Sequence, residues 1–181
     1  MRLQQICLGH LTDDDGETHP VKSNRLGELL NIVEEIQGKA IIWATWTRDI
    51  RAIAEALRAR FSVQAVATLH GEPPDSERQQ VVGSFQDRHS EFRFIVGHPK
   101  TGGYGLTLTA ANTVIYFSNS YDLELRLQSE DRAHRIGQKN NVTYIDLISP
   151  KTIDEKIVDA LRNKIRIADT VLGEDAREWL K

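Results

Sequence analysis

Apolar residues recur along this chain with two different periods. Between Asn24 and Gln37 they fall three or four positions apart, which is the spacing of one helical face. Short continuous apolar runs, such as residues 40–43, instead indicate strands that are buried on both faces. These patterns predict helices at 24–37, 47–60, 76–86, 123–135 and 152–180, the last broken near Gly173, and strands at 40–43, 62–69, 92–96, 113–117 and 142–148.

Strands that alternate with helices at this spacing predict parallel βαβ units. The expected fold class is therefore α/β, a three-layer parallel sheet with helices on both faces, followed by C-terminal helices. In such sheets functional residues gather in the loops beyond the carboxyl ends of the strands. Here those loops are 44–46, 70–71, 98–105, 118–122 and 149–150.

The chain divides into three expected regions. Residues 1–22 are predicted to be the end of a connecting helix, up to Leu11, followed by an acidic linker that includes Asp13, Asp14 and Asp15. Residues 23–150 form the α/β lobe, and residues 151–181 form a helical extension.

Composition narrows the function classes. The net charge of −3 argues against a constitutive, high-affinity nucleic-acid binder, although local phosphate contacts remain possible. The single Cys7 excludes an internal disulfide and fits a reducing, intracellular setting. No apolar run is long enough to predict a membrane span, no signal peptide is recognisable, and the six histidines are too scattered to predict a metal site.

Two arginines stand out in the segment 128–138. Arg132 and Arg135 are three residues apart on the predicted helix, so they share one face, and Gln128 joins that face. Two guanidinium groups side by side suit a polyanion such as a triphosphate, because each offers a planar fork of donors. Charge pattern alone favours a plainer interpretation, a pair of surface arginines bridged to the acidic residues Glu124, Glu130 and Asp131.

A glycine-rich segment covers residues 100–111. Glycines allow close backbone approach, and the threonine-rich stretch after Gly105 is predicted to open a helix whose free N–H groups suit a phosphate. The segment matches neither a dinucleotide-binding fingerprint nor a Walker A loop, and a tight turn explains it equally well.

Taken together, these segments resemble the Swi/Snf-type branch of the superfamily-two helicases, over most of the chain. Residues 128–138 resemble motif VI, 100–111 resemble motif V, and 40–46 stand where motif IV belongs. Residues 2–7 resemble the helix that leads into the second lobe, and 152–157 the start of a helix that braces the two lobes. The style of 116–120 is most similar to phage and bacterial members, which would place the protein in the cytoplasm of a bacterial or phage-infected cell.

The resemblance implies a RecA-like second lobe with a specific division of roles. Arg132 and Arg135 would reach ATP and Mg²⁺ held by a first lobe, and an arginine finger can raise the rate by roughly three to five orders of magnitude. The remaining residues would couple ATP state to DNA (Gln128, Gly103 and Gly105) or contact a DNA strand (Lys100, Gly102, Thr107, Trp46 and His70). Thr107, His70 and Trp46 differ from the family's usual residues, which puts the details of DNA contact in doubt.

No Gly-Lys-Ser/Thr motif and no Walker B acidic pair occur, so we expect the chain to be inactive alone. Its expected partners are a first RecA-like lobe, preceding Met1, and duplex DNA; no membrane contact is expected, and the isolated chain is expected to be a monomer. Two alternatives remain open at this point: a non-catalytic DNA- or protein-binding module with the same fold, and an unrelated nucleotide-binding enzyme that uses the loop 102–105.

Overall fold

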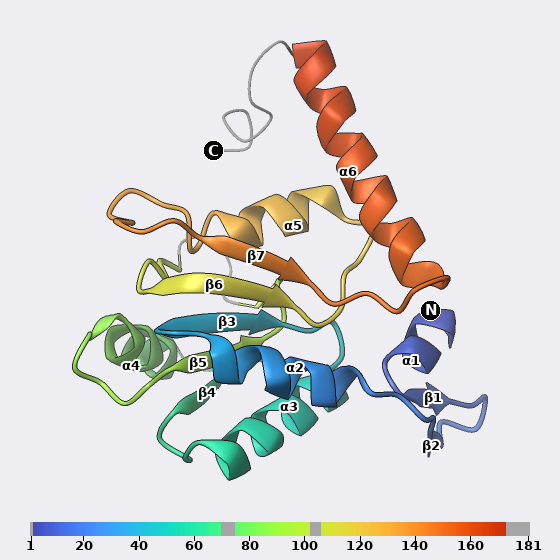
Figure 1. The fold of residues 1–181 in the computed structure, drawn as a ribbon, viewed down its shortest axis with the longest axis horizontal. Coiled ribbons are helices and arrows are strands. Elements are labelled where there is room, and N and C mark those ends of the chain that lie inside the picture. Colours follow the sequence, from blue (N-terminus) through green and yellow to red (C-terminus); the bar gives the residue numbers. More distant parts are fainter. Residues whose placement is uncertain (1, 70–74, 102–105, 173–181) are drawn as a thin grey trace.

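The computed structural model describes residues 2–69, 75–101 and 106–172. Its centre is a sheet of five parallel strands in the order β4-β5-β3-β6-β7 (Figure 1). In chain order the strands are β3 (Lys39–Trp43), β4 (Val66–Leu69), β5 (Phe94–Gly97), β6 (Ala111–Tyr116) and β7 (Thr143–Asp146).

Helices cover both faces of this sheet, which confirms the expected three-layer α/β class. One face packs against α2 (Arg25–Glu35) and α3 (Thr47–Arg60), and the other against α4 (Asp75–Gln86) and α5 (Leu123–Glu130). Side chains of a strand alternate between faces. Ala40 and Ile42 of β3 therefore lie in the first core, and Ile41 and Trp43 in the second.

One glycine is required where β4 and β5 meet. A Cβ atom added to Gly97 would lie 2.5 Å from the backbone oxygen of Leu69, closer than side-chain atoms approach a carbonyl. Gly97 therefore lets the ends of these two strands come together next to the loop that carries His98 and Lys100.

The N-terminal region differs from the predicted helix and linker. Helix α1 (Arg2–Cys7) is short, and the residues after it form an antiparallel hairpin of β1 (His10–Thr12) and β2 (Thr18–Pro20). The turn uses Gly16 at a φ of +84°, and the carboxylate of Asp13 accepts hydrogen bonds from the backbone of Asp15 and Glu17. The acidic run therefore lies in the turn of the hairpin, with an Asp-Gly step as its signal, and the helix predicted up to Leu11 ends at Cys7.

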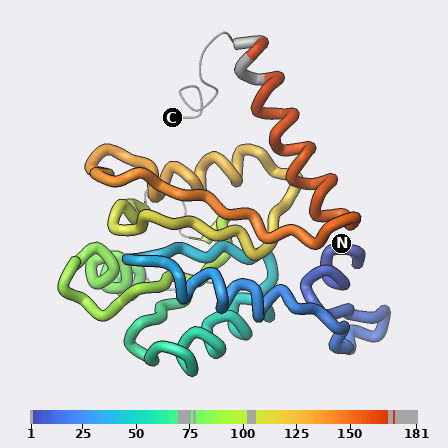
Figure 2. Tube along the Cα trace, viewed as in Figure 1, coloured from blue at the N-terminus to red at the C-terminus, as the bar shows by residue number. Residues whose placement is uncertain are grey.

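Helix α6 (Ile153–Leu172) leaves the sheet after β7 and projects from the lobe (Figure 1). Its first turns pack on the body through Ile157, Val158 and Leu161, and it contacts α1, so the N-terminus lies beside its start (Figure 2). The predicted break near Gly173 lies outside the described residues. Within the described helices, none has the length and apolar character to cross a bilayer.

Helix α5 ends earlier than its sequence pattern predicts. The last helical residue is Glu130, and Asp131 caps the end, so Arg132 and Arg135 lie in the following turns and do not share a helical face with Gln128. The helix ends because the chain turns to bury Arg132 against the sheet, and the backbone oxygen of Arg132 accepts a hydrogen bond from Leu108 at 2.8 Å. Tertiary contacts override local helical preference here.

The threonine-rich stretch after Gly105 also differs from its prediction as the start of a helix. Residues 106–110 form an irregular turn that leads into β6, so they do not open a helix. The phosphate-binding helix N-terminus expected at Thr107 is therefore not formed by the described residues.

Candidate functional site

The loops after β5, β3 and α5 meet at the carboxyl edge of the sheet. Thr101 follows β5, Trp43 ends β3, and Arg132 follows α5. The Nη1 atom of Arg132 donates a hydrogen bond to the backbone oxygen of Thr101 at 3.0 Å, and its guanidinium lies 5.2 Å from the ring centroid of Trp43. Three segments distant in sequence thus converge on one cation.

Arg132 is only 6% exposed, which is unusual for a charged side chain. Burial lowers the pKa of its guanidinium, although arginine stays charged at neutral pH. No salt bridge joins it to a carboxylate among the side chains that the structure describes. A buried cation without an anionic partner is costly. The arrangement is therefore suited to an external anion.

Arg135 lies three residues further along the same turn but is exposed. Its Nη1 atom donates to the hydroxyl of Thr107 at 3.1 Å. The two arginines therefore differ in burial: Arg132 is held against the sheet, and Arg135 lies on the surface beside the glycine-rich segment. The family resemblance implies that Arg135 contacts ATP and that Thr107 contacts DNA. This hydrogen bond therefore joins a predicted ATP-binding residue to a predicted DNA-binding residue.

Gln138 fixes the turn that carries both arginines, and the sequence interpretation gave it no role. Its Nε2 atom donates to the backbone oxygens of Thr109, Ala111 and Ala133, at 3.1, 2.8 and 3.1 Å. Gly137, at a φ of +103°, lets the chain turn back to make these bonds. The segments 106–111 and 131–138 are thereby fastened together.

Gln128 lies on α5 and does not point towards the arginine turn. Its amide donates to the carboxylate of Glu124 at 2.9 Å, one helical turn earlier. Gln128 therefore does not share a helical face with Arg132 and Arg135. Its role in coupling ATP state to DNA stays a prediction.

His98 is a second residue that sequence reasoning passed over. It is half-buried after β5, and its Nδ1 atom accepts a hydrogen bond from the backbone N–H of Lys100 at 2.9 Å. Burial, together with the charges of Lys100 and Arg132, lowers the pKa of His98, so the ring is neutral at pH 7. The exposed Lys100 is held at this edge by that contact.

Trp46 lies on the far side of the same edge, towards the N-terminal hairpin. Its half-buried indole meets the ring of His10 edge-on, with 6.2 Å between the ring centroids. This packing accords with a cap on the sheet edge, the interpretation that the sequence favoured over base stacking. The remaining predicted site residues, His70, Gly102, Gly103 and Gly105, lie outside the described residues.

The described residues also include a group of possible metal ligands and a small cavity. Asp13, Glu17 and His19 offer ligand atoms within 4.8 Å of one another on the exposed hairpin turn. Hydrogen bonds account for their closeness, since His19 Nε2 lies 2.6 Å from Asp13 Oδ2. A cavity beside Tyr116 and Arg126 measures about 10 Å³, enough for about one water molecule.

Comparison with known proteins gives a consistent family. The profile of the helicase conserved C-terminal domain matches residues 21–137. The chromatin-remodeling ATPase INO80 of Mycosarcoma maydis is 35% identical over 159 residues, covering 86% of this chain and 8% of the relative. The SWI/SNF-related matrix-associated actin-dependent regulator of chromatin subfamily A member 1 of Mus musculus is 28% identical over 165 residues, covering 91% of this chain and 16% of the relative.

A solved structure agrees. The C-terminal part of the Fun30 ATPase domain matches with a TM-score of 0.68 and 28% identity, covering 77% of this chain and 46% of that one. The relatives named here are eukaryotic, so the phage or bacterial style inferred from residues 116–120 finds no support. The family profile, the relatives and the fold together show that this chain belongs to the helicase conserved C-terminal domain family, as the C-terminal lobe of a Swi/Snf-type ATPase.

Proposed function

We propose that this lobe completes an ATPase site whose nucleotide is held by another RecA-like lobe, and that it couples ATP hydrolysis to movement on duplex DNA. The observation that carries the proposal is Arg132, a cation that is 6% exposed and has no salt bridge to any carboxylate whose side chain the structure describes. The exposed Arg135 lies in the same turn. A polyphosphate brought by the other lobe would supply the missing negative charge.

In this mechanism Arg135 meets the transferred phosphoryl group of ATP, and Arg132 stabilises the loop geometry and the phosphate charge. ATP and Mg²⁺ belong to the other lobe, since this chain has no Gly-Lys-Ser/Thr sequence. Charge develops on the phosphoryl oxygens during transfer, so donors placed there act mainly on the transition state.

The glycine-rich segment would carry the DNA side of the coupling. Lys100 is exposed and offers a phosphate contact, and Thr107 receives a hydrogen bond from Arg135 at 3.1 Å. If Arg135 moved on ATP binding, its hydrogen bond to Thr107 would move or break, and this would change the position of the Thr107 side chain. The chain spans only 8% and 16% of the lengths of the two relatives, so duplex DNA and the other lobe are proposed as its partners.

The test joins this lobe to an ATP-binding first lobe and measures ATP turnover with and without duplex DNA. Arg135→Ala should lower DNA-stimulated kcat by about 10³-fold, with a much smaller change in KM for ATP, because the contact is made in the transition state. Arg60→Ala is the matched control, since Arg60 is an exposed arginine on α3 that pairs with Glu34. Equal turnover in Arg135→Ala and Arg60→Ala would reject the role of Arg135 and favour a non-catalytic binding module.

A further inference from the structure

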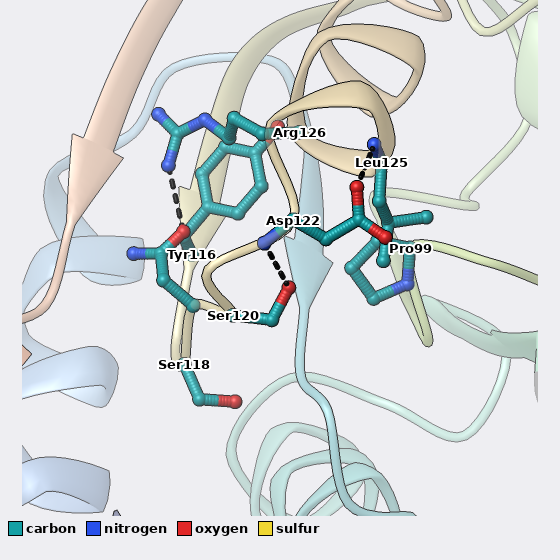
Figure 3. A pocket seen from close by; sticks show the side chains of 8 residues that line it. Pro99, Tyr116, Ser118, Ser120, Asp122, Leu125 and Arg126 are labelled. Carbon is teal, nitrogen blue, oxygen red and sulfur yellow. Dashed lines mark hydrogen bonds between the residues drawn. The ribbon is translucent and has the colours of Figure 1, made fainter. Parts of the chain in front are cut away.

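Arg126 lies on α5 inside the lobe, six residues before Arg132. Its side chain is 11% exposed. The guanidinium carbon lies 3.5 Å from the ring centroid of Tyr116 on β6, and Figure 3 shows the group stacked beside that ring. This cation is therefore part of the packing between α5 and the sheet.

Its hydrogen bonds join three elements. Nε donates to Glu130 of α5 at 2.7 Å, and Nη1 donates to the side-chain oxygen of Asn119, after β6, at 2.8 Å. Nη1 and Nη2 also donate to the two carboxylate oxygens of Asp146 at the end of β7. A planar fork with several fixed acceptors has very little freedom to move.

Two carboxylates supply the negative charge of the cluster. Asp146 and Glu130 both face the guanidinium, and their side chains are 18% and 8% exposed. Burial alone would lower the pKa of Arg126, but Tyr116 and the two carboxylates outweigh it and raise it. The charged form is the stable one in this position.

Glu130 links this cluster to the arginine turn. It is the last residue of α5, and its carboxylate is held by Arg126. Its backbone oxygen accepts hydrogen bonds from the N–H groups of Ala133 and His134, at 3.1 and 3.0 Å, and from the hydroxyl of Tyr144 at 3.3 Å. The turn that contains Arg132 therefore starts from a residue whose side chain and backbone are both fixed to the sheet.

We propose that Arg126 is a positioning residue: by clamping the end of α5 to β6 and β7, it sets where Arg132 and Arg135 stand at the carboxyl edge of the sheet. The inference rests on the proposed function of those two arginines. Arg126 touches neither nucleotide nor DNA in this role, and it acts through the geometry of the turn. Misplacement of a catalytic group by about 1 Å can cost on the order of 10²-fold in rate.

The experiment uses Arg126→Met in the joined two-lobe protein, because methionine keeps much of the apolar stem and removes the fork. We expect a 10- to 100-fold lower DNA-stimulated kcat per folded molecule, with the KM for ATP changed by less than about threefold. The folded fraction is taken from an unfolding curve at the assay temperature. Arg126→Lys keeps the charge without the fork and should fall between wild type and Arg126→Met, and it replaces Arg126→Met if that variant does not fold.

Arg25→Met is the matched control. The side chain of Arg25 is 4% exposed, against 11% for Arg126. Arg25 also ties elements together, since its Nη1 donates to the backbone oxygens of Phe117 and Leu147, but it anchors α2 and not α5. We expect Arg25→Met to lower the free energy of unfolding and to leave kcat per folded molecule unchanged. If Arg126→Met and Arg126→Lys also keep kcat while Arg135→Ala loses it, the positioning role is wrong and the proposed function stands. If Arg135→Ala keeps kcat, the proposed function itself fails.

Discussion

Two buried polar clusters lie near the carboxyl edge of the sheet, and they differ in how completely their charged groups are hydrogen-bonded. Around Arg126, each nitrogen of the guanidinium has an acceptor, and two of these acceptors are carboxylates. Around Asp49, at the start of α3, the facing group is the imidazole of His10, whose Nδ1 lies 3.4 Å from Oδ1 and whose pKa is lowered by burial. The Oδ2 of Asp49 and the indole Nε1 of Trp46 are both buried without a hydrogen-bond partner.

The difference shows when burial keeps a charge and when it removes one. Arg126 stays charged because its partners are fixed on neighbouring strands. Burial raises the pKa of Asp49 to about 7, because nearby Arg48 and Arg25 do not compensate for the lost water. A cluster with complete pairing holds its geometry, while one with incomplete pairing depends on pH.

The largest expected effect comes from breaking the complete cluster. Asp146→Asn removes the carboxylate that pairs with Nη1 and Nη2 of Arg126, and leaves Glu130 as the carboxylate that faces the guanidinium. We expect a loss of about 3 kcal/mol in the free energy of unfolding, the lower end for removing one partner of a buried pair, because Asp146 is partly exposed. Urea unfolding at pH 7 measures it. Asp159→Asn, an exposed carboxylate on α6, should change stability by less than about 0.5 kcal/mol. Similar small losses in both variants would contradict the clamp.

A smaller effect, dependent on pH, is expected from Asp49→Asn. The pKa of Asp49 is higher in the folded protein, about 7, than its ordinary value of 3.8. Its contribution to stability is therefore fully present below about pH 4 and is lost as pH rises towards 7. Relative to wild type, Asp49→Asn should gain about 1–2 kcal/mol between pH 5 and pH 8.

The opposite slope comes from His10, which faces the same carboxylate. Burial lowers the pKa of His10, so its contribution is present above about pH 6.5 and is lost as pH falls. With Asp49 removed, stability should rise with pH between 5 and 7, whereas the wild-type curve should be flatter. Thermal unfolding at several pH values measures the stability of wild type and of Asp49→Asn. Parallel curves of stability against pH for these two proteins would show that Asp49 does not cause the pH dependence.

The smallest expected effect is at Trp46. Trp46→Phe removes a buried N–H that has no partner and loses part of a half-buried ring, so the two changes largely offset each other. Stability should stay within about 1 kcal/mol of wild type. Trp43→Phe is the comparison, because the indole N–H of Trp43 is also buried without a partner, whereas its ring is fully buried and lies under the guanidinium of Arg132. Trp43→Phe should lower the free energy of unfolding by about 2 kcal/mol. An equal or larger loss in Trp46→Phe would mean that the indole of Trp46 contributes more to stability than its contacts indicate.

Much of the lobe is predictable because its strands and helices have clean apolar periods. The helix Thr47–Arg60 is found at the predicted bounds, and each predicted strand is found within a few residues of its position. The arginine turn is less predictable. Its helical pattern continues past Glu130, and only the burial of Arg132 and the hydrogen bonds of Gln138 explain why the helix stops there. The hairpin at Thr12–Thr18 was missed, although an Asp-Gly step was visible in the sequence.

The sequence by itself determined the layered α/β class, the family resemblance and the two segments in which the important arginines and glycines lie. These depend on local periodicity and on residue order, which one chain displays directly. The tertiary structure decided that Arg132 is buried and Arg135 exposed, and that Arg126 joins α5 to Asp146 across 20 residues. Such facts depend on which strands become neighbours, since the partners of a buried charge come from segments that only the folded sheet brings together.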